Sequence, residues 1–154
     1  MPKFNALVLN RDDDENLSHA VEQLDESELP AEGEVLIDVE YSTVNYKDGL
    51  CFAGQRGLVK SYPHIPGIDF AGEVISSEDD RYSAGDKVIL TGWRVGEIWW
   101  GGFAQRAKVK ADWLVPLPKG LTTRDAMSVG TAGLTAMLSI LTLEDRGLQK
   151  GDGE

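Results

Sequence analysis

The stretch EVLIDVEYSTV at residues 34–44 alternates apolar and polar side chains, as a strand with one buried face requires. Five other short stretches are predicted as strands: 4–10, 68–75, 86–92, 103–109 and an irregular one at 113–118. Twelve glycines and six prolines before Thr122 supply frequent turn signals along this part of the chain. Many short strands with frequent turns indicate a barrel or a sandwich.

The character of the sequence changes at Thr122. The following residues, TTRDAMSVGTAGLTAMLSILTLEDRG, predict a helix, a break of small residues, and a second amphipathic helix that ends near Gly147. The chain is therefore expected to be mainly β with helices (α+β), with the helices at its C-terminal end.

Composition favours a folded protein of the cytoplasm. Hydrophobic residues make up 42% of the chain. The longest apolar-rich stretch, at 132–143, is too short to span a bilayer, so we expect no membrane association. The N-terminus lacks the apolar core of a signal peptide, and Cys51 is the single cysteine, which excludes an internal disulfide.

The charge distribution argues against a nucleic-acid partner. The net charge is −11, and residues 12–40 hold twelve of the 26 acidic residues with no lysine or arginine. Such a segment repels a phosphate backbone. The DDDE run at 12–15 predicts a solvated turn rather than a metal loop. Basic residues come later in the chain, where they would suit a small anionic ligand.

Four polar residues stand side by side in the stretch VNYKDGLCFAG at 44–54. Asn45 as an N-cap, with Asp48 three residues later, approximates a capping box at the start of a helix. Capping leaves Tyr46 and Lys47 unexplained at the entrance of the same helix.

Five motifs in order resemble those of a known superfamily. They are NYKD at 45–48, PHIPGIDFAGEV at 63–74, GDKVILTG at 85–92, GGFAQ at 101–105 and VGTAGLTA at 129–136. The order resembles the medium-chain dehydrogenase/reductase superfamily, within it the zinc-free quinone-oxidoreductase-like branch that includes NADPH-dependent acryloyl-CoA reductases.

The resemblance implies a fold and an activity. It implies a GroES-like, partly open β-barrel as the catalytic domain over residues 1–125. Residues 126–154 would form a helical connection toward a dinucleotide-binding domain. The implied reaction is the NADPH-dependent reduction of an activated carbon–carbon double bond in a small-molecule substrate, by a homo-oligomer.

The resemblance also implies that no zinc is bound. Asn45, Ile68 and Thr131 stand where zinc-dependent relatives carry their ligands, and none of them offers a thiolate or an imidazole. A single cysteine cannot form the structural zinc cluster. His64 is interpreted as an ordinary loop histidine.

The same resemblance implies the site residues. It places the NYKD turn beside the nicotinamide and the substrate carbonyl, which makes Asn45, Tyr46, Lys47 and Asp48 the candidate catalytic residues. The side chains of the first three can donate hydrogen bonds to a developing oxyanion. The proton for the α-carbon could come from Tyr46, from Lys47 or from water.

Two further stretches each have a functional and a structural interpretation. Tyr46, Thr131 and Thr135 are candidate contacts to the cofactor, although helix packing alone explains VGTAGLTA nearly as well. In TGWRVGEIWWGG at 91–102, Trp93 and Arg94 are the candidate substrate contacts. Alternatively, the tryptophans of this stretch fill one end of the barrel.

One expected feature of the superfamily is missing. Its members continue past a turn like GDGE, at 151–154, into the glycine-rich fingerprint of a Rossmann domain, and this sequence holds no such fingerprint. We therefore expect the Rossmann domain to be absent from this chain and the chain alone to be inactive. The alternatives left open are the substrate domain of an enoyl-CoA reductase, that of a quinone reductase, and a non-catalytic GroES-like fragment.

Overall fold

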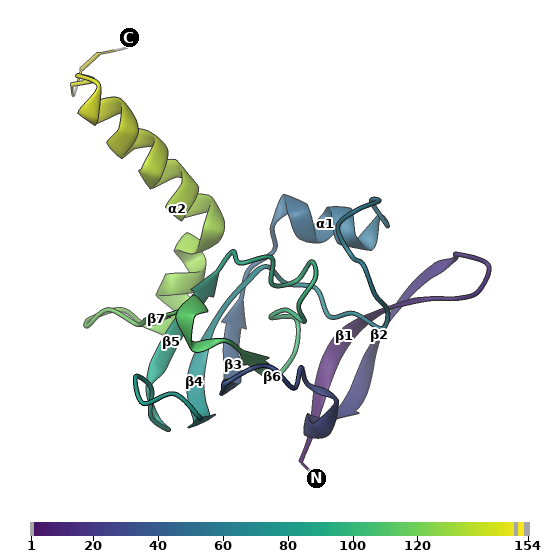
Figure 1. Ribbon diagram of the computed structural model, residues 1–154. Coiled ribbons are helices and arrows are strands. Elements are labelled where there is room, and N and C mark those ends of the chain that lie inside the picture. Colours follow the sequence, from purple (N-terminus) through teal and green to yellow (C-terminus); the bar gives the residue numbers. More distant parts are fainter. Residues whose placement is uncertain (1, 150, 153–154) are drawn as a thin grey trace.

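The computed structural model describes residues 2–149 and 151–152, so the end of the GDGE stretch lies outside the described residues (Figure 1). The strands are β1 (Lys3–Arg11), β2 (Leu17–Asp25), β3 (Val35–Ser42), β4 (Asp69–Ser77), β5 (Lys87–Thr91), β6 (Arg106–Val109) and β7 (Leu114–Pro116). The helices are α1 (Tyr46–Phe52) and α2 (Thr123–Asp145), with 3₁₀ turns η1 (Glu26–Glu28) and η2 (Ala111–Trp113).

The strands form two antiparallel sheets. One is the hairpin β1–β2, and the other has five strands in the order β6-β3-β4-β5-β7. Isolated bridges Ala6–Ala104 and Leu9–His64 connect β1 to segments of the chain that flank the larger sheet. The expected fold, mainly β with helices, is confirmed.

The main core lies on one face of the five-stranded sheet. Val35 and Ile37 of β3 are fully buried, as are Phe70 and Leu90 of the neighbouring strands β4 and β5. Residues two apart on a strand point to the same face, which is why the alternating pattern of 34–44 predicted this strand correctly. Burying each such side chain contributes about 1.5–3 kcal/mol to stability.

Strand β2 was not predicted from the sequence. It pairs with β1 along its whole length, with the DDDE run forming the turn between them. Most of its side chains are exposed, so its sequence, LSHAVEQLD, carries no alternating apolar pattern. The turn end of the hairpin projects from the body of the molecule (Figure 1), and β2 is mostly exposed, so pairing rather than burial specifies this second strand.

Helix α2 contains the predicted break. Gly130 has φ 52° and ψ −163°, which is not helical, and it divides a bent helix in two. The first part packs against the sheet through Ala126 and Met127, which form a small cluster with Ala71 of β4. The second part projects away from the sheets (Figure 1).

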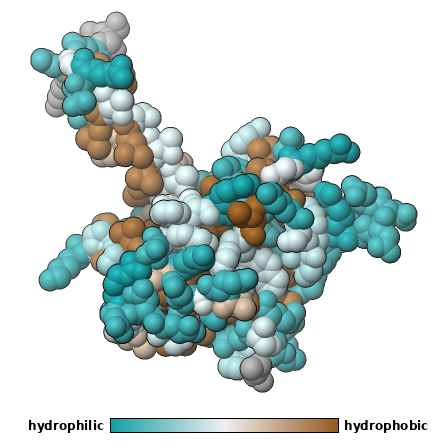
Figure 2. Space-filling view, viewed as in Figure 1, coloured by the Kyte–Doolittle hydropathy of each residue, from teal (hydrophilic) through white to brown (hydrophobic). Residues whose placement is uncertain are grey.

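The projecting part of α2 is apolar and exposed. Figure 2 shows hydrophobic residues along it, and Leu134, Met137, Leu138 and Leu141 are each 44–54% exposed. By length and composition alone α2 could cross a membrane, with a mean hydropathy of 1.6. The apolar helix is therefore longer than the stretch 132–143 that the sequence indicated. After the bend at Gly130, however, the helix spans roughly 22 Å, which is short of the ~30 Å of a bilayer core.

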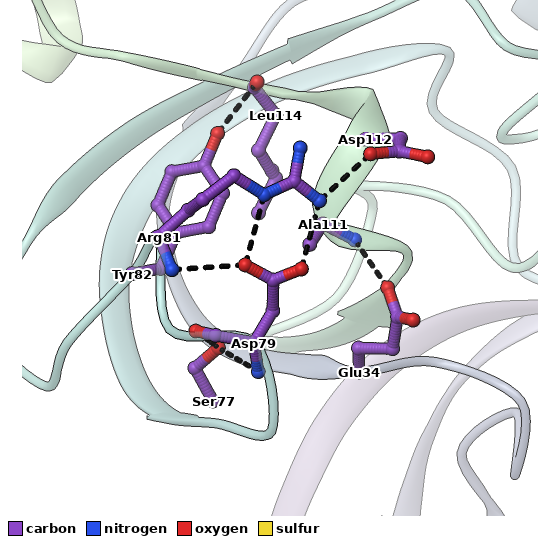
Figure 3. A network of polar contacts seen from close by, with 8 residues as sticks. All are labelled: Glu34, Ser77, Asp79, Arg81, Tyr82, Ala111, Asp112 and Leu114. Atoms are coloured by element: carbon purple, nitrogen blue, oxygen red, sulfur yellow. Dashed lines mark hydrogen bonds and ion pairs between the residues drawn. The ribbon is translucent and has the colours of Figure 1, made fainter.

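A polar network fastens the turn between β4 and β5 to η2 and β7 (Figure 3). Arg81 Nη2 donates to Asp79 Oδ2 at 2.8 Å and to Asp112 Oδ1 at 2.7 Å. The hydrogen bonds from Arg81 lower the pKa of Asp79 to about 2. The hydroxyl of Tyr82 donates to the carbonyl of Leu114 at 2.7 Å and so ties the same turn to β7.

Candidate functional site

The NYKD turn is held by a capping box, as the sequence predicted. Asn45 is the N-cap of α1, and its backbone N–H donates to Asp48 Oδ2 at 2.7 Å. The other carboxylate oxygen of Asp48 accepts from the backbone N–H of Ile68 at 3.0 Å. One buried side chain thus ties the start of α1 to the loop that precedes β4.

Asp48 is therefore a structural anchor of the turn. It is fully buried, and burial raises the pKa of its carboxyl, with the nearby charge of Asp69 acting in the same direction. The hydrogen bonds from backbone N–H groups oppose that rise. Because both oxygens are occupied by backbone donors, Asp48 can influence a substrate only through the position of its neighbours.

Asp69 joins two predicted site segments that are far apart in the sequence. Its Oδ1 accepts from Asn45 Nδ2 at 3.2 Å, and its Oδ2 accepts from the backbone N–H of Thr131 at 2.8 Å. Asp69 is fully buried at the start of β4. Through these two hydrogen bonds Asp69 fixes the positions of Asn45 and Thr131 relative to each other.

The bend at Gly130 makes this contact geometrically feasible. A Cβ at Gly130 would lie 2.8 Å from Thr43 Cγ2 and 3.1 Å from Asp69 Oδ2. Only glycine combines this backbone conformation with so close an approach. The bend turns the N–H of Thr131 toward the carboxylate, because that N–H no longer continues the first part of the helix.

A second carboxylate, Glu97, joins the NYKD turn to the loop between β5 and β6. Its Oε1 accepts from Lys47 Nζ at 3.0 Å, and its Oε2 lies 3.5 Å from Arg94 Nε. Glu97 is 6% exposed. The structure thus brings together Lys47 and Arg94, one a predicted catalytic residue and the other a predicted substrate contact.

The tryptophans of this loop differ in their surroundings. Trp99 packs against the main core and Trp100 against the cluster beside β1, so the barrel-filling interpretation describes these two. Trp93 is 59% exposed and stacks on Trp113, with ring centroids 6.3 Å apart and planes at 17°. Trp93 and Arg94 both have left-handed backbones, with φ of 56° and 59°, which cost on the order of 1–3 kcal/mol each.

The candidate cofactor residues lie on two elements. Tyr46 is 85% exposed at the start of α1. The Thr131 hydroxyl is buried without a hydrogen-bond partner among the described residues, whereas the Thr135 hydroxyl donates to the carbonyl of Thr131 at 2.8 Å. Asp69 accepts hydrogen bonds from both Thr131 and Asn45 and so links them. Thr135 lies one turn farther along α2 and is exposed.

The three positions that carry zinc ligands in zinc-dependent relatives, Asn45, Ile68 and Thr131, all contact Asp48 or Asp69 in this chain. Asn45 and Thr131 bind Asp69, and Ile68 binds Asp48 through its backbone. Among the described residues no three histidine, cysteine, aspartate or glutamate side chains form a metal-binding group.

Two buried side chains beside the site bear on its chemistry. The Cys51 thiol donates to the carbonyl of Gly96 at 3.5 Å, and burial raises its pKa to about 11, so it stays protonated. His64 is 1% exposed rather than an ordinary loop histidine, and burial lowers its pKa. Neither group therefore carries a charge at neutral pH.

Glu97 and Trp113 were not predicted from the sequence. Glu97 is the one acidic residue in the glycine- and tryptophan-rich stretch 91–102, and that was an available signal. Nothing in the local pattern connects Trp113 with Trp93, since twenty residues separate them and only the fold stacks their rings.

Comparisons with known proteins find relatives among reductases and oxidoreductases. Residues 31–119 match the family model of the alcohol dehydrogenase GroES-like domain. The acrylyl-CoA reductase AcuI of Ruegeria pomeroyi is 62% identical over 97% of this chain and 46% of its own length. The quinone oxidoreductase of Sus scrofa is 28% identical over 73% of this chain and 33% of its own length.

A solved structure agrees with the fold. The crystal structure of the yhdH oxidoreductase from Salmonella enterica in complex with NADP superimposes with a TM-score of 0.91. It is 53% identical and is matched over 97% of this chain and 45% of its own chain. This chain therefore spans about half the length of the AcuI reductase of Ruegeria pomeroyi and of the yhdH oxidoreductase of Salmonella enterica.

Proposed function

The chain belongs to the alcohol dehydrogenase GroES-like domain family, and from that premise we propose that it is the catalytic domain of an NADPH-dependent reductase of activated carbon–carbon double bonds. Acryloyl-CoA or a related enoyl-CoA is the proposed substrate. The observation that carries the proposal is the convergence of the NYKD turn, Thr131 and Arg94 around two buried carboxylates. The 62% identity to an acrylyl-CoA reductase favours the thioester substrate. The likeness to a quinone oxidoreductase favours quinones as the second candidate.

The residues around the NYKD turn and the bend of α2 fit a nicotinamide cofactor. The buried Thr131 hydroxyl has an unused donor and acceptor, and it lies next to the N–H that binds Asp69. Tyr46 offers an exposed phenol at the start of α1. We assign Tyr46, Thr131 and Thr135 as contacts near the nicotinamide end. When bound, NADPH supplies the hydride that goes to the β-carbon of the enoyl thioester.

The chain's own residues stabilise the charge that develops on the thioester oxygen. The ammonium of Lys47 has three N–H donors, and Glu97 occupies one of them. The Tyr46 phenol is exposed and is a further donor. The Asn45 amide already donates to Asp69, so it orients the turn and contributes less to the oxyanion than the sequence suggested.

Asp48 and Asp69 keep these donors in place. Asp48 holds the backbone of the turn, and Asp69 locks the turn to α2. Such pre-organisation means that little rearrangement is needed when the charge forms. The exposed tip of Tyr46 is the group we propose for transfer of the proton to the α-carbon, because the phenol is reached directly from solvent.

We further propose that the site works without zinc, because Asn45, Ile68 and Thr131 offer no thiolate or imidazole. Residues 1–125 form the catalytic unit, and 126–154 lead toward a dinucleotide-binding domain. The protein acts in the cytoplasm as a homo-oligomer. It engages neither nucleic acid nor a membrane.

The test is steady-state reduction of acryloyl-CoA by NADPH with a full-length chain, compared with a panel of quinones. Tyr46→Phe should lower kcat by about 10²–10³-fold with little change in KM, because one donor is lost. Tyr41→Phe on β3 is the matched control, since Tyr41 is also exposed. Wild-type turnover by Tyr46→Phe would refute the catalytic role of Tyr46 and leave helix capping as the only role of the NYKD turn.

The same preparation tests the other parts of the proposal. Turnover of quinones but not of acryloyl-CoA would favour the second candidate, and turnover of neither would indicate a non-catalytic module. Elemental analysis should find no stoichiometric zinc in the active enzyme. One tightly held zinc per chain would contradict the zinc-free site.

A further inference from the structure

The loop between β5 and β6 places one buried carboxylate between two cations. Glu97 is 6% exposed, and it binds Lys47 Nζ at 3.0 Å and approaches Arg94 Nε at 3.5 Å. The side chains of Lys47 and Arg94 are 46% and 47% exposed. The carboxylate thus belongs to the interior, while both cations reach solvent.

Stability alone is a weak reason for a charge at this position. Burying a carboxylate loses its hydration, and the attraction of its partners often does no more than offset that loss. An uncharged side chain of similar shape would fill the same space. The carboxylate at Glu97 therefore points to a role for the positions of its two partners.

The backbone next to Glu97 supports that interpretation. Trp93 and Arg94 are consecutive non-glycine residues in the left-handed region. The carbonyl of Arg94 accepts from the backbone N–H of Glu97 at 3.2 Å and of Ile98 at 3.0 Å. Unfavourable conformations of this kind persist where the surroundings hold them, and they gather at functional sites. Glu97 contacts this turn through both its backbone and its side chain.

We propose that Glu97 is a positioning residue for the proposed reaction. Its carboxylate holds the Lys47 ammonium and the Arg94 guanidinium at fixed places, and it couples the NYKD turn to the Trp93–Arg94 turn. The inference rests on the proposed function, in which Lys47 stabilises the oxyanion and Arg94 contacts the substrate. Glu97 itself contacts neither the oxyanion nor the substrate, and it acts through the side chains of Lys47 and Arg94.

Removal of the carboxylate should leave the fold intact. The thiol of Cys51 still ties α1 to the loop through the carbonyl of Gly96. Within the loop, the N–H of Gly96 donates to the carbonyl of Trp99 at 2.7 Å. The N–H of Gly101 donates to the carbonyl of Ile65 at 2.7 Å. Glu97→Gln is therefore a usable variant.

The kinetic test uses a full-length chain with NADPH and acryloyl-CoA. Glu97→Gln should lower kcat by about 10²-fold, with the KM for NADPH little changed, because a catalytic cation is misplaced by about an ångström. Glu97→Asp keeps the charge and should recover part of the loss. Glu40→Gln is the matched control, because Glu40 also accepts from a lysine, Lys87 Nζ at 2.6 Å.

A double variant separates positioning from a general structural effect. Because Glu97 acts in part through Lys47, Glu97→Gln should lower kcat less in a Lys47→Met background than in the wild-type enzyme. An equal loss of kcat in both backgrounds would overturn the proposal. So would wild-type kcat in Glu97→Gln alone.

A measurement without turnover keeps this inference separate from the proposed function. In nuclear magnetic resonance spectra of the 154-residue chain, Glu97→Gln should shift the Lys47 ammonium and the Trp93 indole N–H signals, and the Trp100 indole should not move. Unchanged Lys47 and Trp93 signals would overturn the proposal. A wild-type enzyme that fails to reduce acryloyl-CoA, together with these shifts, would refute the proposed function and leave the positioning of Lys47 and Arg94 supported.

Discussion

Replacing Gly130 by alanine tests whether the bend in α2 is required by the site. The backbone at Gly130, with φ 52° and ψ −163°, is accessible almost only to glycine, and strain there costs about 1–3 kcal/mol. The new Cβ would lie 2.8 Å from Thr43 Cγ2 and 3.1 Å from Asp69 Oδ2. Overpacking of this kind adds about 1–3 kcal/mol.

The combined loss should be about 2–6 kcal/mol. For a domain of this size, a loss of about 4 kcal/mol corresponds to a fall in Tm of roughly 8–16 °C. The amide of Thr131 should also exchange with solvent faster, because relaxation of the bend draws its N–H away from Asp69. The measurements are thermal unfolding by circular dichroism and hydrogen exchange.

Gly49→Ala is the control with the opposite expected sign. Gly49 lies inside α1, and a Cβ there meets nothing within 4 Å among the described residues. Alanine in the interior of a helix should raise stability by about 0.5–1 kcal/mol. A Gly130→Ala variant that unfolds at the wild-type temperature would refute the argument that the bend needs glycine.

Two further predictions concern the exposed helix and the buried histidine. The 154-residue chain should self-associate through α2, because the side chains of Leu138 and Leu141 are exposed and each gains about 1.5–3 kcal/mol when buried. In sedimentation velocity, the double variant Leu138→Glu/Leu141→Glu should therefore be a monomer, whereas the control variant Val21→Glu should still self-associate. Self-association of the double variant would contradict this prediction. The stability of the chain should fall as the pH drops below the ordinary His64 pKa of 6.5, because burial lowers the pKa of His64 and the unfolded chain then binds the extra proton. The slope contributed by His64 is at most about 1.4 kcal/mol per pH unit, and denaturant titrations should show it reduced in His64→Gln; equal slopes in both proteins would count against the assignment.

The sequence by itself determined the elements whose signal is local. The alternation in 34–44 reflects burial of one face of β3, the spacing of Asn45 and Asp48 forms a capping box, and the small residues after Val129 mark the bend at Gly130. Each of these depends on residues within a few positions of one another, and the backbone geometry of a strand, a cap or a turn is set at that range.

Only the tertiary structure decided which of these local features meet. Asp69 joins Asn45 to Thr131, and Glu97 joins Lys47 to Arg94, across separations that no periodic pattern spans. These contacts depend on how the sheet, α1 and α2 pack together, and a buried carboxylate is recognisable as a link only when its partners are in place. Strand β2 escaped prediction for a related reason, since an exposed strand is specified by pairing with its neighbour and leaves no alternating apolar pattern.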